Sequence, residues 1–228
     1  MNHPPFSVAM CVYYKDNPDH FVIAIESVLN QSVPPNEIVL VVDGPVPDSL
    51  ESVIKNFENR LRIKIIRLLQ NQGHGHARRI CLEQCTNDLI ALMDADDISV
   101  PDRFEKQLQV FSLDSRLSIV GGNIAEFIGK PSNVVCVRNV PRTDADIKRY
   151  MKKRCPMNQV TVMFRKSDVD RVGGYVDWYS EEDYYLWLRL MIAGCMFSNI
   201  NAELVKVRVG KDMYQRRGGW NYFRSEAK

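Results

Sequence analysis

The sequence predicts an α/β protein built on a doubly wound, mostly parallel sheet, with a smaller mixed half attached to it. Through the first hundred residues, uninterrupted apolar runs alternate with segments of helical period. Strands of a parallel sheet covered on both faces appear as continuous apolar runs, and helices connect them. After Pro101 the regular alternation ends, and strands and helices follow one another in an α+β order.

The elements of the first half follow from these apolar runs. "FSVAMCVYY" (6–14) is β-rich and nearly uncharged, and the next segment (20–31) carries apolar residues at helical spacing. Further strands are expected at 37–44, 62–69 and 89–94, with a helix at 48–60 and another through Arg78 to Cys85.

The second half is expected to begin with a helix from Pro101 to about Phe111. It continues with strands at 117–129 and 133–140, a basic helix, a strand at 159–167, a helix at 181–193 and a last strand near 203–209. No linker, internal repeat or low-complexity stretch interrupts the sequence. We therefore expect a single domain, 1–228, whose two functional halves meet near residue 100.

Composition excludes several classes of protein. The 228 residues carry a formal charge of +2, which argues against a dedicated nucleic-acid binder. The six cysteines form no CxxC pair, so reduced thiols are expected rather than a zinc site. No secretory pattern precedes the first strand and no apolar run is long enough to span a bilayer, so we expect a cytoplasmic protein. A basic cluster at 148–154 is either a solvated helix face or a contact for phosphates or anionic lipid.

Three aspartates follow directly on a buried strand in "LIALMDADD" (89–97). Helix capping does not explain Asp94, Asp96 and Asp97, because Ser99 is the better cap for a helix with Pro101 in its first turn. A bound Mg²⁺ or Mn²⁺ ion explains the three aspartates, because these ions take carboxylate oxygens as ligands and bridge them to phosphates. Ligands of open α/β sheets bind beyond the carboxyl ends of the strands, where Tyr13 and Asp43 are also expected.

"NQGHGHARR" (71–79) follows the third expected strand. It lacks the last glycine of a dinucleotide fingerprint, but a helix start with small residues and an arginine suits an anion. Its histidines, His74 and His76, are expected to be exposed loop residues rather than metal ligands.

"SEEDYYLWLRL" (180–190) starts a strongly apolar helix. Ser180 and Asp183 approximate a capping box, and acids suit a first helical turn. An acid at the mouth of a buried helix is also a candidate general base. The residues alone leave both interpretations open.

On these motifs the chain resembles the family 2 glycosyltransferases, inverting enzymes with the nucleotide-sugar-binding fold called GT-A. It is similar to the bacterial members that build surface polysaccharides such as O-antigen and capsule. The resemblance runs from "SVAMCVYYKDNPDHF" through "LMDADDISVPDRF" and "VTVMFRKSDVDRVGGY" to "EEDYYLWLRL", in matching order and spacing. It implies a nucleotide-binding half at about 1–100 and an acceptor-side half at about 101–228.

The resemblance also implies the roles of site residues toward a nucleotide-sugar donor, expected to be a UDP-sugar. Cys11 and Tyr13 would lie beside the nucleobase, and Asp43 would accept a hydrogen bond from uracil. Arg78 would help to hold the nucleotide, and Asp94 would lie near the ribose.

The same resemblance assigns Asp96 to the Mn²⁺ or Mg²⁺ ion on the diphosphate and Asp183 to the catalytic base. Asp183 would deprotonate a hydroxyl of a glycan or lipid-linked saccharide acceptor, which displaces the nucleotide in one inverting step. The basic residues Lys206, Arg208, Lys211, Arg216 and Arg217 would close over the diphosphate or meet anionic lipid. A location peripheral to the inner face of the cell membrane is therefore expected.

The chain also departs from the family. "NQVT" (158–161) replaces an Asn-His-Pro-Thr-like stretch, Gly210 stands near a position often held by histidine, and "QRRGGW" (215–220) is not the motif of processive synthases. The chain ends soon after its last expected strand, so C-terminal truncation is an expectation. Two alternatives are a phosphatase of the haloacid dehalogenase type and a non-catalytic nucleotide-sugar-binding protein. In that phosphatase class, however, the aspartate motif ends the first strand, not the fourth.

Overall fold

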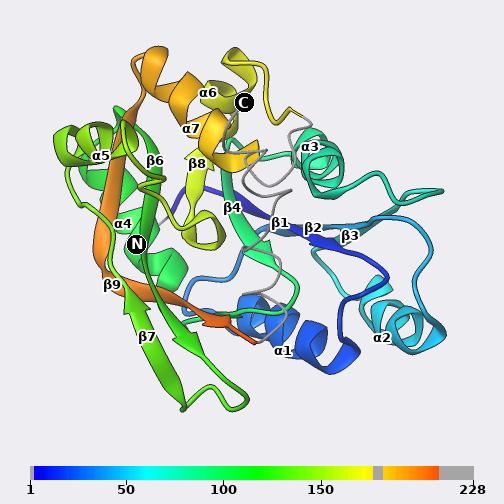
Figure 1. The fold of residues 1–228 in the computed structure, drawn as a ribbon. Helices are drawn as coiled ribbons and strands as arrows, with labels where there is room; N and C mark the ends of the chain where they lie inside the picture. Colours follow the sequence, from blue (N-terminus) through cyan, green and yellow to red (C-terminus); the bar gives the residue numbers. More distant parts are fainter. Residues whose placement is uncertain (1–2, 177–181, 211–228) are drawn as a thin grey trace.

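The computed structural model describes residues 3–176 and 182–210 (Figure 1). Its strands are β1 (Phe6–Val12), β2 (Glu37–Val42), β3 (Ile63–Arg67), β4 (Leu89–Asp94), β5 (Ile98–Ser99), β6 (Leu117–Phe127), β7 (Val134–Arg138), β8 (Met163–Arg165) and β9 (Met196–Arg208). Its helices are α1 (Pro18–Leu29), α2 (Asp48–Glu58), α3 (His74–Gln84), α4 (Arg103–Leu113), α5 (Asp144–Met151), α6 (Lys166–Arg171) and α7 (Glu182–Ile192), with one 3₁₀ turn, η1 (Gln159–Thr161).

The predicted fold class is confirmed. Within the described residues, one sheet runs in the order β3-β2-β1-β4-β8-β6-β9-β5, and β7 pairs with β6 beside this path. β1 is parallel to both β2 and β4, and β2 is parallel to β3. The remainder is mixed, because β8 is antiparallel to β4 and β6 whereas β9 is parallel to β6.

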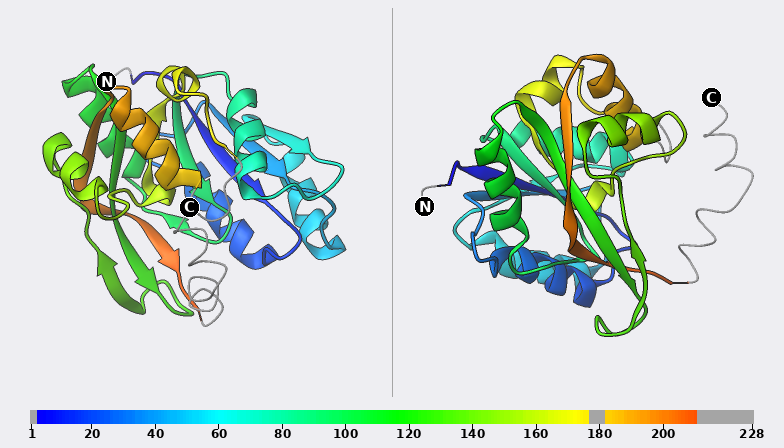
Figure 2. Two further views of the ribbon diagram at one scale, coloured as in Figure 1. Left: turned by 45° about the horizontal axis from the view of Figure 1, so that its top comes forward. Right: turned by 90° about the vertical axis from the view of Figure 1, so that its left-hand side faces the viewer.

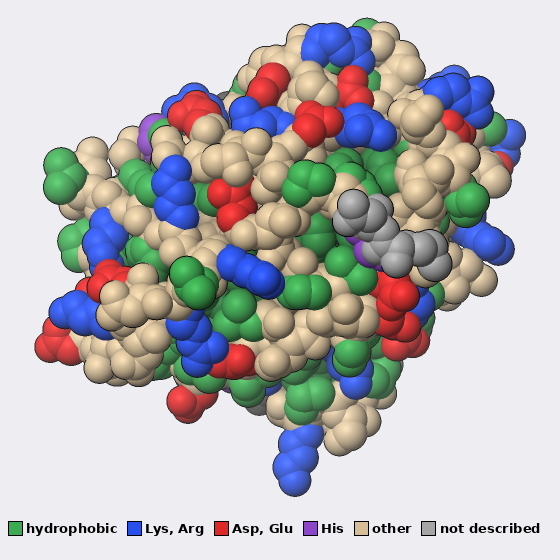
Figure 3. Space-filling view, turned by 180° about the vertical axis from the view of Figure 1, so that it is seen from behind, with side chains coloured by type: hydrophobic (Ala, Val, Ile, Leu, Met, Phe, Trp, Pro, Cys, Tyr) green, Lys and Arg blue, Asp and Glu red, His purple; other side chains and the backbone are tan. Residues whose placement is uncertain are grey.

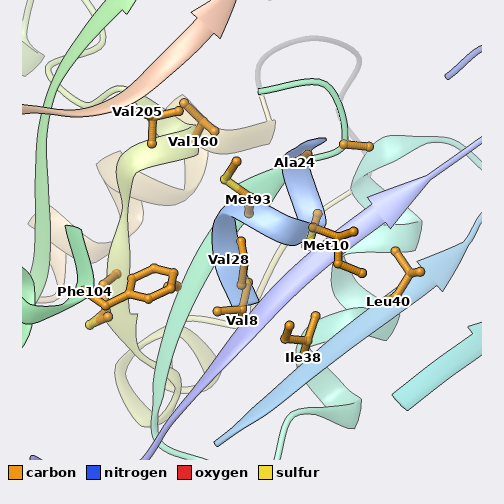
Figure 4. Close-up of a cluster of buried hydrophobic side chains, with 14 of the residues drawn as sticks. Val8, Met10, Ala24, Val28, Ile38, Leu40, Met93, Phe104, Val160 and Val205 are labelled. Carbon is orange, nitrogen blue, oxygen red and sulfur yellow. The ribbon is translucent and has the colours of Figure 1, made fainter. Parts of the chain in front are cut away.

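Helices cover both faces of the sheet, and successive strand residues face opposite sides. Val8 and Met10 of β1 belong to the core cluster under α1, α2 and α4, part of which is drawn in Figure 4. Ala9, between them, belongs to the second cluster, under α3, α5 and α7. This double burial explains why the strands appear in the sequence as unbroken apolar runs.

The last strand is longer than predicted and begins at Met196 rather than near residue 203. The first half of this strand was not predicted because it contains asparagines, and the sequence alone does not show what a buried amide binds. Asn199 is buried and donates to the carbonyl oxygens of Pro141 and Pro156 at 2.7 and 3.2 Å. The strand expected at 159–167 is also shorter, because η1 turns the chain before β8.

Two features of the second half bear on the site. β9 pairs with β6 over most of its length, so its end at Arg208 lies beside Phe127 at the end of β6. The β6–β7 hairpin projects beyond the helical layers, as the two further views in Figure 2 show. None of the helices in the described ranges is long and apolar enough to cross a membrane.

Candidate active site

The carboxyl ends of the three central parallel strands bring the predicted site residues to one edge of the sheet. Cys11 of β1 pairs with Val41 of β2 on one side and with Asp94 of β4 on the other. Tyr13 follows β1 directly and is half-buried, and Asp43 follows β2 directly and is buried. Residues expected together from strand order are therefore neighbours in the structure.

Asp43 anchors the loop that leads into α3. Its Oδ1 accepts from the backbone N–H of Gln72 at 2.8 Å, and its Oδ2 accepts from Gly73 N at 3.0 Å and Asn71 Nδ2 at 2.9 Å. The next residue, Gly44, has φ +83°, and a Cβ there would lie 2.4 Å from Asn71 N. The two loops are thus in backbone contact, and Oδ1 keeps one lone pair for a further donor.

Arg78 is fully buried beneath this edge. It donates through Nη1 to Ala9 O at 3.2 Å and through Nη2 to Asp94 Oδ1 at 2.8 Å. Burial opposes its charge, but nearby Cys11 and Asp94 outweigh burial and raise its pKa above the ordinary value. In turn, the pKa of Cys11 is lowered to about 7 by a hydrogen bond with Cys81 and by Arg78, against the effect of burial.

Replacing Arg78 by leucine is expected to lower the free energy of unfolding by about 2–3 kcal/mol. Removing one partner of a buried ion pair costs more than this, but Asp94 is partly exposed and regains water. Denaturant titration measures the loss. Arg79→Leu is the matched control, because Arg79 is only half-buried and bonds His76, and it should change stability by less than about 0.5 kcal/mol. Equal losses in both variants would contradict the role given to Arg78.

We call residues 94–97, at the end of β4 and just after it, the aspartate loop. Two arginines hold this loop from two sides. Asp94 is bound by Arg78, and the buried Asp97 accepts from the backbone N–H of Arg208 at 2.9 Å. Arg208 also donates through Nε to Asp96 O at 3.2 Å. Burial and the charges of Asp96 and Asp94 raise the pKa of Asp97 well above its ordinary value, and Arg208 offsets them only in part. Arg208 is therefore a fixed part of the loop, whereas Lys211, Arg216 and Arg217 of the predicted basic segment lie outside the described residues.

Asp16 is a fifth acid at this edge, beside Asp43 and the three aspartates at 94–97, and it was not predicted from the sequence. Its Oδ2 accepts from Tyr13 N at 2.9 Å in the loop between β1 and α1. Its pKa is raised to about 7 by burial first and then by the charges of Asp96 and Asp94, although the Tyr13 hydrogen bond opposes the shift. The available signal was its place just after a parallel strand, where open α/β sheets bind ligands; the next residue, Asn17, caps α1.

A hydrogen-bonded chain connects the start of α3 to the start of α7. His74 Nδ1 lies 2.9 Å from Glu182 Oε1, and His74 Nε2 lies 3.0 Å from Arg78 Nη2. Arginine only donates, so Nε2 accepts and Nδ1 carries the proton that is donated to Glu182. Burial would raise the pKa of Glu182, but the hydrogen bond from His74 and the charge of Arg78 lower it. His74 is half-exposed, yet it is the first residue of α3 rather than a loop residue as predicted.

Asp183 follows Glu182 in the first turn of α7 and is partly buried. Its Oδ1 accepts from Tyr184 N at 2.7 Å, which is a local bond of the capping type. Burial and the charge of Glu182 nevertheless raise its pKa to about 6. Ser180, the other member of the predicted capping box, and Glu181 lie outside the described residues.

The donor set fits a hard divalent ion held jointly with phosphates. Asp94 and Asp96 are partly exposed carboxylates on one loop, and oxygen is the ligand that Mg²⁺ and Mn²⁺ take. In residues 3–176 and 182–210 no three His, Cys, Asp or Glu side chains are grouped to hold a metal by themselves. Mg²⁺ usually binds through one or two carboxylates and completes its coordination with waters and substrate phosphates.

The fold and this edge together define a GT-A-like transferase: a mostly parallel sheet, an acidic loop after the fourth strand, and a second acidic site at the start of the half-buried helix α7. Residues 7–173 match the family described as Glycosyl transferase family 2. The chain belongs to this family. The haloacid dehalogenase alternative is thereby disfavoured.

Two of the relatives that match nearly the whole chain come from Erwinia amylovora and Escherichia coli. The amylovoran biosynthesis glycosyltransferase AmsE of Erwinia amylovora is 39% identical over 97% of this chain and 82% of its own length. The UDP-Gal:alpha-D-GlcNAc-diphosphoundecaprenol beta-1,3-galactosyltransferase of Escherichia coli is 38% identical over 99% of this chain and 82% of its own length.

Among solved structures, TarS 1–349 of S. aureus in complex with UDP superposes with a TM-score of 0.71 at 18% identity. The superposition covers 93% of this chain and 63% of that chain. At this level of identity the likeness concerns the fold, and it agrees with the predicted sheet.

Proposed function

We propose that the protein transfers a sugar from a UDP-sugar to a hydroxyl of a lipid-linked or glycan acceptor, with inversion at the anomeric carbon. The observation that carries this proposal is the convergence of two acidic sites on one sheet edge. Asp94 and Asp96 supply oxygens suited to a metal–diphosphate group, and Asp183 supplies a base of raised pKa. The chain from Asp94 through Arg78 and His74 to Glu182 ties the two sites together.

The nucleotide would lie over the ends of β1 and β2. Cys11 and Tyr13 would flank the base, and the free lone pair of Asp43 Oδ1 would accept the imide N–H of uracil. Asp94 would lie by the ribose, with Arg78 behind it. These assignments rest on the family resemblance and on the placement of each residue at the same edge.

The chemistry is a single displacement in which Asp183 acts as the base. Its carboxylate takes the proton of the acceptor hydroxyl, and that oxygen bonds to the anomeric carbon while the bond from this carbon to the diphosphate breaks. Glu182, fixed by His74, holds the start of α7 against α3 and so orients Asp183. A Mn²⁺ or Mg²⁺ ion held by Asp96 would supply stabilisation of the charge that develops on the leaving diphosphate.

The relatives support the choice of substrates. The name of the Escherichia coli relative gives UDP-Gal as donor and a diphosphoundecaprenol-linked sugar as acceptor, and the S. aureus structure contains UDP. UDP and a lipid-linked acceptor are thus the substrates we propose for this chain.

UDP with Mn²⁺ is expected to stabilise the fold by about 2.7 kcal/mol at a hundredfold excess over the dissociation constant. Thermal denaturation with UDP, GDP or CMP, each with and without metal, measures the effect. CMP should do much less because cytosine N3 has no hydrogen to donate to Asp43, and GDP because the larger purine does not place its N1–H where uracil places its N3–H. A shift with GDP or CMP but none with UDP would refute the uracil assignment. Slow metal-dependent hydrolysis of the UDP-sugar without acceptor would rule out a protein that only binds.

A further inference from the structure

The β6–β7 hairpin is the most exposed regular element of the described chain. Every residue from 128 to 139 is exposed, on both faces of β7. The hairpin forms the lower projection in Figure 3, where hydrophobic side chains surround it and a Lys or Arg side chain marks its tip. A strand of this kind has neither a core nor a neighbouring helix to bury its side chains.

Its apolar side chains are too many and too close together to be scattered surface residues. Ile128, Val134, Val135 and Val137 are each between 42% and 48% exposed. Contiguous apolar side chains on a projecting element mark a surface that meets a partner or a membrane.

The hairpin carries a net positive charge, although Glu126 of β6 pairs with Cys136 in its ladder. The stretch 127–143 contains Lys130, Arg138 and Arg142 and no acidic residue. Lys130 and Arg138 are both exposed, at the tip and at the end of β7. Aliphatic side chains among cations match the boundary of an anionic bilayer, where apolar groups enter and basic groups meet phosphates.

The turn of the hairpin, which connects Phe127 to Val134, is bonded to the candidate active site. Arg208 donates through Nη1 to Gly129 O at 3.1 Å and through Nε to Asp96 O at 3.2 Å. Its guanidinium also lies 4.7 Å from the ring centre of Phe127. A surface that holds the hairpin would therefore be held next to the aspartate loop.

We propose that residues 128–139 dock on an anionic lipid surface and place the aspartate loop beside the bilayer. This inference rests on the proposed function. It explains how the candidate active site reaches a lipid-linked acceptor, whose diphosphate lies at the level of the lipid headgroups. The hairpin is the membrane contact. Arg208, which bonds both Gly129 O and Asp96 O, fixes the aspartate loop relative to the hairpin.

Two other occupants fit less well. In a second copy paired edge to edge through β7, each hairpin would bring Lys130 and Arg138 to residues 127–143 of the other copy, which contain no acid to neutralise them. The C-terminal segment 211–228 is also a poor electrostatic partner. It carries Lys211, Arg216, Arg217, Arg224 and Lys228 against only Asp212 and Glu226.

Co-sedimentation of the full chain with vesicles tests the proposal. Vesicles of phosphatidylethanolamine with phosphatidylglycerol should bind the protein, and phosphatidylcholine vesicles should bind it weakly. Lys130→Gln with Arg138→Gln should lower the affinity by roughly thirtyfold, and high salt should have a similar effect. Val135→Thr with Val137→Thr keeps the β-branched shape and should also weaken binding. Lys55→Gln with Arg60→Gln removes the same charge from exposed positions near α2 and should change little.

A dye on the hairpin gives a second readout. All six cysteines lie in the described part of the chain, and Cys136 of β7 is the exposed one. An environment-sensitive fluorophore on Cys136 should shift to the blue on anionic vesicles and be quenched by a lipid-borne nitroxide.

Any of three results would overturn the proposal. These are no binding to anionic vesicles, equal binding by the hairpin and control variants, and a dimer that the hairpin variants dissociate. UDP affinity without vesicles is measured on the same proteins. If UDP binds while vesicles do not, the membrane contact fails alone; if UDP does not bind, the proposed function fails.

Discussion

Replacing Asp183 by asparagine is expected to lower transfer by about 10²–10⁴-fold, the usual worth of general-base catalysis. Asparagine keeps the shape of the side chain and an oxygen for the bond from Tyr184 N, so the fold and UDP affinity should survive. Transfer, melting temperature and UDP affinity measured on one preparation separate catalysis from folding.

The pKa of Asp183 adds a pH test. At about 6, the base becomes protonated as the pH falls through that value, so wild-type transfer should fall there. Asp16, with a pKa of about 7, titrates in both the wild type and Asp183→Asn. The inflection of the pH profile that disappears in Asp183→Asn is therefore the one due to Asp183.

Stability should change in the direction opposite to that of a lost cap. A carboxyl whose folded pKa lies above its unfolded value costs stability once the pH exceeds the unfolded value of about 3.9. Asparagine removes this cost, so the melting temperature at neutral pH should hold or rise. Loss of a helix cap would instead cost about 1 kcal/mol with transfer intact. Asp48→Asn, at an exposed acid in the first turn of α2, is the control. Near-normal transfer by folded Asp183→Asn would leave Glu181 or Glu182 as the base.

Replacing Asp96 by alanine is expected to weaken metal-dependent UDP binding and transfer together, by at least about 100-fold. Loss of a residue that only supports a ligand costs 10–100-fold in metal affinity, and a direct ligand should cost more. Calorimetric titration of UDP with and without Mn²⁺ measures the change. The melting temperature without ligand should not fall, because the charge of Asp96 raises the pKa of both Asp97 and Asp16 and its removal relieves them.

Asp102→Ala is the matched control for Asp96. Asp102 lies in the same segment, is half-exposed and pairs with Lys106, so its loss should leave UDP binding unchanged. If Asp96→Ala retained metal-dependent UDP binding, the metal assignment would have to move to Asp94 or Asp16.

The parallel half of the fold could be predicted because double burial leaves a direct mark on the sequence. Every residue of β4 from Leu89 to Met93 is buried, on one face or the other, and the apolar run is therefore continuous. β5 could not be predicted, because its two residues form a strand only by pairing with Lys206 and Val205 of β9.

The site was predictable where it depends on strand order and unpredictable where it depends on contacts across the chain. Cys11 and Asp94 are neighbours because parallel strands align their ends. The contact of His74 with Glu182 spans 108 positions, and no local period encodes it. Aspartates crowded after a strand suggest a bound cation, but the sequence does not show that Arg78 and Arg208 already hold two of them.

The bonds from Asp94 through Arg78 and His74 to Glu182 limit how hybrid enzymes can be made from this family. A hybrid that joins residues 1–100 of this protein to the remainder of a relative keeps Asp94, Arg78 and His74 but replaces Glu182 by the relative's residue. A hybrid without an acid at position 182 would leave His74 Nδ1 without its acceptor. His74 would then be held less firmly beside Arg78. We therefore predict that hybrids of this kind keep these bonds only between parents whose residues at positions 74 and 182 are compatible.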